Sequence, residues 1–350
     1  MFAALDLGTN NCRLHIVSPL KRGYKIVDSF NRVVCLGEGL HHTGLLSEAA
    51  MKRTMYALQH CADRIKRRKT FNIYAVATEA CRRAANAPLF LDQVKNKTGL
   101  SINIISTREE AELALEGCAP FLHDKTLMDD KNRALLFDIG GGSTEIIWVR
   151  IDRARGQQTL AGYCSIPVGV LTLKEQFKKI TTDSYNQMVL CIIDKLLAFE
   201  QVHRIRAEIL RNQVQLMGVS GTITTLASLI LKLEKYNRSA VDGMLLKSSE
   251  TRKIIKNLLI HKINSLESCS CIDKDRIEYI IPGCAIFEAI HTLWPIGSVI
   301  VADRGLRDGI IAKMMRYKYH KNKAEFPTPY YPLIQNTSIY KSSFLPQTIS

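Results

Sequence analysis

A run of three glycines inside an apolar, strand-like segment constrains this chain more than any other feature. The segment covers residues 135–149, LLFDIGGGSTEIIWV, and predicts two short strands joined by a tight turn. Because glycine lacks a Cβ and tolerates positive φ, successive N–H groups of such a turn can converge on one anion. We predict a phosphate loop made of Gly140, Gly141, Gly142, Ser143 and Thr144. A glycine-rich hairpin without a ligand is the alternative, although a plain hairpin needs only two turn residues.

Two carboxylates flank this turn. Asp138 precedes the glycines and Glu145 follows them. Both would repel a phosphate unless a hard divalent cation bridged them, as Mg²⁺ does in phosphoryl-transfer sites. We therefore predict Asp138 and Glu145 as ligands of Mg²⁺ or another divalent cation.

The chain contains this unit twice. Residues 4–17, ALDLGTNNCRLHIV, overlay the later segment with Asp6 on Asp138 and Gly8 on Gly140. A repeat at this long period predicts two similar domains that face each other rather than a solenoid. By this correspondence Asp6 becomes a further metal ligand, and the first loop adds the phosphate-binding residues Thr9, Asn10 and Asn11.

A third place for an anion follows a later apolar strand. Residues 218–222, GVSGT, open a helix whose first N–H groups can meet a phosphate. We predict Ser220, Gly221 and Thr222 as phosphate-binding residues, with an ordinary strand-to-helix turn as the alternative.

Composition limits the class of protein and its partners. The chain has 350 residues, 46% of them hydrophobic, which is enough for two domains of ordinary size. It contains no apolar run of membrane-spanning length and begins directly with a strand-like segment, so we expect a cytoplasmic protein without membrane contact. The ten cysteines, Cys269 and Cys271 included, lack zinc-site spacing and are interpreted as reduced thiols.

The formal charge of +15 points to a polyanionic partner. Nucleic acid, an inorganic phosphate polymer and a highly phosphorylated nucleotide all satisfy this requirement. Nucleic acid is the weakest of the three, because the basic runs are not interleaved with aromatic residues. For the basic run at residues 64–69, a solvated helix face is the alternative interpretation.

The order of the expected elements is that of an α/β protein with mixed sheets. In the first half we expect strands at 2–9, 12–18, 23–34, 71–77 (buried) and 102–105, and helices at 47–69, from 88, and at 108–118. A polar linker without periodicity follows at 123–133. The second half repeats this order, with strands at 134–139, 144–151, 160–167, 214–219 and 298–301, and helices at 221–231, 253–259, 276–293 and up to residue 316. From Tyr317 onward we expect a disordered tail or a docking segment.

A water-activating group is needed if the bound phosphate is to be hydrolysed. Glu109 and Glu110 lie at the start of a helix that follows a strand predicted to be buried. Neighbours in a helix lie about 100° apart, so one of the two can face the cleft. The alternative is that both only complement the helix dipole. Arg82 follows the predicted strand 71–77, on the same sheet edge as the Asp6 loop, where its guanidinium could clamp phosphate oxygens; a surface arginine is the alternative.

Six ordered motifs resemble the exopolyphosphatase and guanosine-pentaphosphate phosphatase family over residues 2–316. They are the segments 6–10, 78–86, 104–111, 138–145, 218–222 and 303–309. The resemblance implies two actin-like, ribonuclease-H-like domains around a phosphate cleft, and release of terminal phosphate from polyphosphate or pppGpp with Mg²⁺. It further implies Glu110 as the water-activating glutamate and Arg82 as a substrate-side arginine, and such proteins often form homodimers.

The chain departs from the family pattern at two positions and in its length. Asn11 stands where the family usually has serine, and Thr107 where it usually has glycine. The chain matches the short form without the helical extension that lengthens the polymer channel. We divide it into an N-terminal domain (1–125 with 305–316), a second domain (126–304) and a tail (317–350).

Two rival functions use the same loops. An actin-like sugar or acetate kinase would pass the phosphate to an acceptor, for which no separate signature is visible. A phosphate- or nucleotide-binding regulatory protein would show little or no turnover. Steady hydrolysis of polyphosphate without a partner would exclude this second rival.

Overall fold

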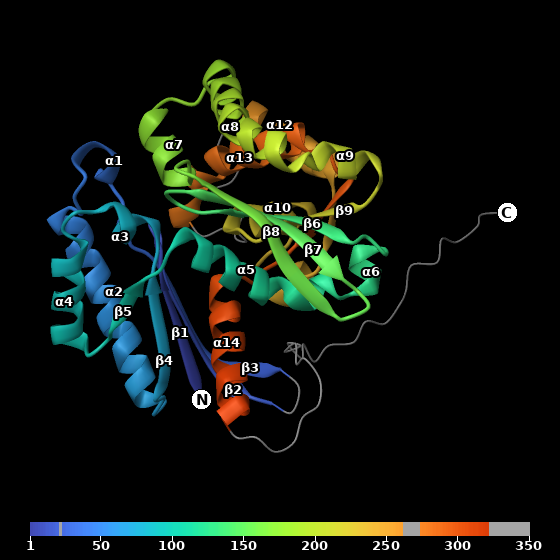
Figure 1. Cartoon of the computed structure of the whole chain (residues 1–350). Coiled ribbons are helices and arrows are strands. Elements are labelled where there is room, and N and C mark those ends of the chain that lie inside the picture. Colours follow the sequence, from blue (N-terminus) through green and yellow to red (C-terminus); the bar gives the residue numbers. More distant parts are fainter. Residues whose placement is uncertain (21–22, 262–273, 322–350) are drawn as a thin grey trace.

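The computed structural model describes residues 1–20, 23–261 and 274–321 and shows a mixed sheet in each half of the chain (Figure 1). The first sheet has the strand order β3-β2-β1-β4-β5. Its strands are β1 (Phe2–Leu7), β2 (Asn11–Pro19), β3 (Tyr24–Val33), β4 (Asn72–Ala77) and β5 (Ile102–Ile104). β1, β2 and β3 form an antiparallel meander, and β4 and β5 run parallel to β1. The predicted mixed sheet is confirmed.

The second sheet repeats this topology. Its strands are β6 (Arg133–Ile139), β7 (Thr144–Asp152), β8 (Gln157–Ile166), β9 (Val214–Gly218), β10 (Leu245–Lys247) and β11 (Ser298–Val301). Their order is β10-β11-β9-β6-β7-β8. The antiparallel meander β6-β7-β8 matches β1-β2-β3, and β9 and β11 take the places of β4 and β5. The duplication inferred from two short motifs therefore extends to whole sheets.

Helices cover the outer face of each sheet. α2 (Glu48–Arg67) and α4 (Ala87–Thr98) bury apolar side chains against the first sheet, as predicted. The side chain of Ser47 accepts a hydrogen bond from the Ala50 N–H and so begins α2. α8 (Thr182–His203), α12 (Ser248–His261) and α13 (Ile280–Leu293) contribute to the core on the outer face of the second sheet.

Two helices lie between the sheets, and each packs on the half of the molecule that is distant in sequence (Figure 1). α5 (Thr107–Leu122) follows the first sheet but buries apolar residues such as Cys118 against the second. α14 (Leu306–Lys321) follows the second sheet but packs residues such as Ile310 against the first. The helices cross closely: a Cβ on Gly117 of α5 would lie 2.3 Å from the oxygen of Gly305, directly before α14, and 3.1 Å from the nitrogen of Gly309 within it. Glycine is therefore required for the crossing.

Shorter helices connect these layers. They are α1 (Leu40–Thr43), α3 (Glu79–Arg83), α6 (Lys125–Met128), α7 (Val170–Gln176), α9 (Ile205–Leu210), α10 (Gly221–Ile230), α11 (Arg238–Val241) and the 3₁₀ helix η2 (Lys274–Tyr279). Within the described ranges, no helix is both long and apolar enough to cross a membrane.

Three expectations about local structure were wrong. Phe71, placed in a buried strand, is 89% exposed, and only the last three residues of β4 are buried. The reason is that the short β5 pairs only with Ala75 to Ala77 of β4. β5 is itself an edge strand whose last two residues are exposed. The linker at 123–133 contains α6, whose Met128 is buried in the core; one helical turn is too short to show periodicity.

At the end of the chain, α14 continues through the first five residues of the predicted tail, to Lys321. The rest of that tail, residues 322–350, lies outside the described residues, as do Cys269 and Cys271. The cysteines from the described ranges are free thiols, as predicted.

Candidate functional site

The two predicted phosphate loops have the same hydrogen-bonded geometry. Gly8 N–H donates to the Asn11 oxygen at 2.9 Å, and Gly140 N–H donates to the Ser143 oxygen at 2.9 Å. A neighbouring segment binds the carbonyl oxygens of each loop: Asn10 O accepts from the Cys35 N–H, and Gly141 O accepts from the Leu171 N–H. With these carbonyls occupied, the N–H groups of Thr9, Asn10, Gly141 and Gly142 find no acceptor within the described residues and are left for a ligand.

The loops also touch each other. A Cβ added to Gly141 would lie 3.0 Å from the Asn10 nitrogen, and one added to Gly142 would lie 2.8 Å from Thr9 Oγ1. The glycine run therefore has a second role besides the approach of a ligand. It lets the two halves of the molecule meet at the base of the site.

A cleft of about 560 Å³ opens above the touching loops. The predicted site residues that line it are Asp6, Thr9, Asn10, Asn11, Glu110, Asp138, Gly140, Gly141, Gly142, Ser143, Glu145, Ser220, Gly221 and Thr222. Two of the predicted site residues, Thr144 and Arg82, do not line the cleft. Thr144 is fully buried and its hydroxyl donates to the Val168 oxygen at 2.6 Å, and Arg82 forms an ion pair with the cleft-lining Glu110.

Strand register aligns the polar side chains of the cleft into two rows. In the first sheet Asp6 lies opposite Arg13, which lies opposite Asn31. In the second sheet Asp138 lies opposite Glu145, which lies opposite Ser165. Residues opposite each other in neighbouring strands share a face of the sheet. Arg13 thus occupies in the first domain the place that Glu145 occupies in the second. At this position the first sheet carries a positive side chain and the second sheet a negative one.

The carboxylates of the cleft repel one another. Burial, with the charge of Asp138, raises the pKa of Glu145 to about 7. Burial, with the charges of Glu110 and Asp6, raises the pKa of Asp138 to about 7, although Arg13 opposes this shift. Ser143 and Ser165 both donate to Oε1 of Glu145, at 2.6 and 2.9 Å, which orients this side chain. Such a group of partly protonated carboxylates favours a cation as ligand.

The side chains of Glu110 and Glu109 point in different directions, because neighbouring residues of a helix lie about 100° apart around its axis. Glu110 lines the cleft, whereas Glu109 accepts from the Tyr74 hydroxyl at 3.2 Å and pairs with Lys313 at 3.5 Å. Arg82 Nη1 lies 2.7 Å from Glu110 Oε2, and Arg82 also binds Glu79 and the Ile105 oxygen. Burial, followed by the charge of Glu145, raises the pKa of Glu110 to about 8, and Arg82 opposes this shift.

The third predicted loop lies on the second-domain side of the cleft. Ser220 begins α10, and its Oγ accepts from the Ile223 N–H at 3.4 Å. Thr222 faces Gly283 of α13, where a Cβ would lie 2.3 Å from the threonine hydroxyl. Ser220, Gly221 and Thr222 therefore line one cavity together with the two glycine loops.

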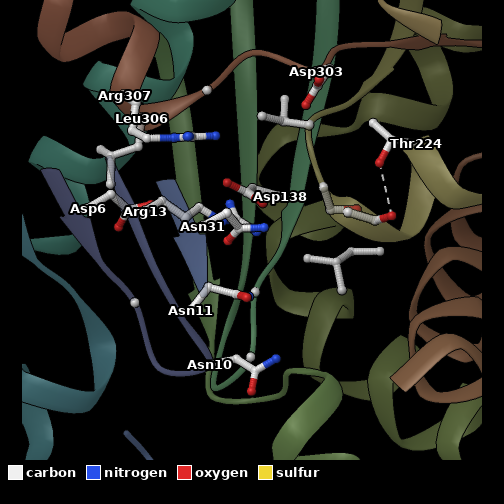
Figure 2. A pocket seen from close by; sticks show the side chains of 18 of the residues that line it. Asp6, Asn10, Asn11, Arg13, Asn31, Asp138, Thr224, Asp303, Leu306 and Arg307 are labelled. Carbon is white, nitrogen blue, oxygen red and sulfur yellow. Dashed lines mark hydrogen bonds between the residues drawn. The ribbon is translucent and has the colours of Figure 1, made fainter. Parts of the chain in front are cut away.

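Sequence reasoning missed two arginines that line the cleft, Arg13 and Arg307 (Figure 2). Within the described ranges, neither has a salt-bridge partner, whereas the neighbouring Arg304 pairs with Asp242 at 2.9 Å. The repeat itself contained the signal for Arg13, because the overlay of Asp6 on Asp138 places Arg13 on Glu145. Arg307 lay in a recognised motif, but its spacing gave no reason to prefer it over Arg304.

No group of three or more His, Cys, Asp and Glu side chains in the described ranges is arranged to hold a metal ion. A metal at this site would thus need oxygen ligands from a substrate or from water as well as from the carboxylates.

Comparisons with solved structures support the two-domain actin-like fold. An exopolyphosphatase from Cytophaga hutchinsonii superposes with a TM-score of 0.79 at 21% identity, covering 90% of this chain and 98% of that one. A Ppx/GppA family member from Aquifex aeolicus superposes with a TM-score of 0.72 at 25% identity, covering 93% and 99%. The fold class predicted from sequence is confirmed.

Comparisons of sequence give the family. The chain is 27% identical to a putative exopolyphosphatase of Haemophilus influenzae over 325 residues, covering 91% of each protein. It is 27% identical to a guanosine-5'-triphosphate,3'-diphosphate pyrophosphatase of Vibrio atlanticus, but spans only 59% of that relative. It spans 47% of a bifunctional 3-dehydroquinate synthase/phosphatase of Fusobacterium nucleatum. Since residues 16–318 match the model of the Ppx/GppA phosphatase family, the chain belongs to that family.

Proposed function

We propose that this protein hydrolyses the terminal phosphoanhydride bond of inorganic polyphosphate or of guanosine pentaphosphate (pppGpp). The family and the names of the relatives support both substrates. The observation that carries the proposal is the position of Glu110, a largely buried carboxylate with 15% of its side chain exposed, which shares one cleft with both phosphate loops.

The terminal phosphate would sit between the two loops. The N–H groups of Gly141 and Gly142, which have no acceptor within the described residues, would donate to it from one domain, and those of Thr9 and Asn10 from the other. Because the loops already touch, these donors are in place before the substrate binds and need little reorganisation in the transition state.

The donor set fits Mg²⁺. This ion binds through one or two carboxylates together with phosphate oxygens and water, so it does not require three clustered protein ligands. One or two of the carboxylates of Asp6, Asp138 and Glu145 would supply oxygen ligands to the ion. Asn11 adds an amide oxygen, Oδ1, that is buried without a partner within the described residues. When bound, Mg²⁺ would neutralise charge on the transferred phosphoryl group.

Glu110 would accept a proton from the attacking water. As the water oxygen bonds to the terminal phosphorus, the anhydride bond breaks and the shortened chain leaves as an anion. The pKa of about 8 suits a group that must accept a proton near neutral pH. Arg82, 2.7 Å from Glu110, acts here as a positioning residue that holds the carboxylate toward the cleft.

A pair of adjacent glutamates provides the test. Phosphate release from polyphosphate and from pppGpp is measured with Mg²⁺ for the wild type, Glu110→Gln and Glu109→Gln. Loss of a general base typically costs about 10²–10⁴-fold in rate, so Glu110→Gln should lose a factor of that order. Glu109→Gln, which changes a side chain outside the cleft, should stay near wild type. Equal rates for the two variants, or no release by the wild type, would refute the proposal.

A further inference from the structure

One wall of the cleft consists of side chains that the proposed hydrolysis does not use. They are Thr224, Thr225 and Ser228 of α10, Tyr236 and Arg238 at or just before the start of α11, and Asp303 between β11 and α14. α10 contacts both α11 and β11, so these side chains belong to one region of the second domain. Figure 2 shows Asp303 and Thr224 on the same side of the cleft, across from Asp6 and Arg13. The wall can therefore contact a part of the substrate other than its terminal phosphate.

The α10 hydroxyl groups of this wall can offer a ligand only acceptor lone pairs, because each already donates its single proton. Thr224 and Thr225 donate to the Gly221 oxygen at 3.0 and 2.8 Å, and Ser228 donates to the Thr224 oxygen at 2.9 Å. A hydroxyl has one proton to donate and two lone pairs that accept. The wall therefore favours a ligand group that donates hydrogen bonds.

Asp303 is the strongest acceptor of the wall. The Tyr236 hydroxyl donates to its Oδ2 at 2.6 Å, and Arg238 Nε lies 3.3 Å from the same oxygen. Its Oδ1 receives no hydrogen bond within the described residues, and 30% of the side chain is exposed. The charge of Arg307 also acts on Asp303, but among the residues that the structure describes the two form no ion pair. The carboxylate is thus held through one oxygen, and the other is left for a ligand.

A guanine base matches this wall better than a phosphate group does. The Asp303 carboxylate would repel a phosphate, and Arg238, the cation of the wall, is already paired with Asp303 and Asp308. The Watson–Crick edge of guanine carries two adjacent donors, N1–H and the N2 amino group, and a carboxylate accepts both. Adenine has an acceptor in place of this N1–H, so its lone pair would face those of the carboxylate. The chemistry of the wall therefore favours guanine over adenine.

We infer that Asp303, with the α10 hydroxyls beside it, binds the guanine base of a nucleotide substrate. This inference rests on the proposed function, because it takes the two loops as the seat of the terminal phosphate. A cleft of about 560 Å³ lies within the usual range of small-molecule sites. Asp303 thereby distinguishes the two proposed substrates, since pppGpp carries a guanine base and polyphosphate does not.

Exchange of the base tests this assignment. Binding of GTP, XTP, ATP and tripolyphosphate, with Mg²⁺, is measured by calorimetry in the Glu110→Gln protein so that the ligands are not consumed. GTP carries the base and the 5'-triphosphate of pppGpp. This protein should bind GTP about tenfold or more tightly than ATP and XTP, because a site built for a hydrogen-bonding group rejects analogues that lack it.

Asp303→Asn should change the preferred base. GTP binding should weaken about ten- to a hundredfold, and tripolyphosphate binding should stay unchanged. XTP binding should become tighter, because xanthine carries an oxygen in place of the N2 amino group and the asparagine amide can donate to it. Asp303→Glu keeps the charge beside Arg238 but moves the carboxylate by one methylene, so it should lose the preference for GTP without gaining one for XTP. A purely structural role of Asp303 would not produce this exchange.

Asp152→Asn is the matched control. It makes the same change at a carboxylate that interacts with Arg155 and does not line the cleft, so no affinity should change. Thermal unfolding shows that each variant is folded. If Asp303→Asn does not fold, Asp303→Glu and the base preference of the unchanged wall decide the question.

Three results would overturn the inference. Equal affinity for GTP and ATP with Asp303 in place would show that the cleft does not read the base. A folded Asp303→Asn protein that keeps its preference for GTP would show that another group reads it. An equal loss for all four ligands would show that Asp303 only shapes the cleft. Failure of the proposed function would look different, because the wild type would then release no phosphate although the preference for guanine remained.

Discussion

Glu110 is subject to opposing influences that set its protonation. Burial and the charge of Glu145 favour the neutral acid, and Arg82 favours the carboxylate. The carboxylate is the form that accepts a proton, so kcat/KM should rise with pH through the pKa of Glu110.

Arg82→Gln removes the group that lowers this pKa. We expect the rising limb of the pH–rate profile to move to higher pH by about one to three units, and the rate at neutral pH to fall accordingly. Arg83→Gln is the control, because the neighbouring Arg83 has Glu79, at 3.9 Å, as its one ion-pair partner among the residues that the structure describes. A midpoint that stays fixed or moves to lower pH in Arg82→Gln would contradict this role.

The carboxylates of the cleft also make stability depend on pH. The pKa of Asp138 and of Glu145 is raised to about 7 by burial first and by neighbouring carboxylates second. Each group therefore binds more protons in the folded than in the unfolded state between roughly pH 4 and 7, where an unfolded carboxyl has already ionised. Without metal, stability should fall as pH rises through this window.

Asp138→Asn removes one of these charges. In the presence of a chelator we expect this variant to melt above the wild type at pH 8, by about 2–4 °C for each kcal/mol gained, and the difference to become small near pH 4, where the wild-type carboxyl is protonated in the folded state and half protonated in the unfolded state. Asp194→Asn, at an exposed carboxylate of α8, should change neither. Thermal unfolding at both pH values checks this. A metal-free Asp138→Asn protein that is less stable than wild type at pH 8 would show that the Asp138 charge does not destabilise the cleft.

At the scale of elements, the crossing of α5 and α14 depends on close backbone contact. A Cβ on Gly309 would lie 1.8 Å from the Leu113 oxygen, which belongs to the helix backbone and cannot move aside. We expect Gly309→Ala to lower the free energy of unfolding by about 1–3 kcal/mol or more. Gly297→Ala is the control, because its Cβ would meet nothing within 4 Å. Urea unfolding distinguishes the two, and equal stability would mean that the helices can separate at little cost.

The features that were predicted correctly have sequence patterns whose residues lie close together in the chain. The loops at Gly8 and Gly140 were recognisable because glycine, flanking carboxylate and apolar strands lie within a few residues of each other. The features that were not predicted depend on contacts between residues that are distant in the sequence. The exposure of Ile104 follows from β5 being an edge strand, and the pairing of Arg82 with Glu110 joins residues from different elements. Arg307 was distinguishable from Arg304 only after Asp242 was seen to bind the latter.

At the scale of the whole molecule, α5 and α14 tie the two sheets together around the cleft. α5 carries Glu110 at its first turn and packs on the second sheet, and α14 carries Arg307 and packs on the first. The helix that carries each of these two cleft-lining residues thus packs on the sheet that is distant in sequence, so the cleft depends on both domains together. The predicted homodimer and cytoplasmic location stay predictions.

The net charge of +15 acts on the whole molecule as well. Some basic residues are neutralised locally, since Arg64 and Arg68 both pair with Asp28 at 2.6 and 3.3 Å. The remaining excess should draw polyphosphate to the cleft and be screened by salt. We expect kcat/KM on polyphosphate to fall as NaCl is raised at constant Mg²⁺. A rate that does not depend on salt would show that the charge has no part in substrate capture.

The most direct test of the central claim, attack by water on the terminal phosphorus, is the fate of labelled oxygen. The wild-type protein is supplied with pppGpp or polyphosphate and Mg²⁺ in ¹⁸O-labelled water, and the products are analysed by mass spectrometry. We predict one ¹⁸O atom in each released phosphate, none in the shortened product, and a rate that collapses in Glu110→Gln but not in Glu109→Gln. Label in the shortened product, or phosphate released at the wild-type rate by Glu110→Gln, would contradict it.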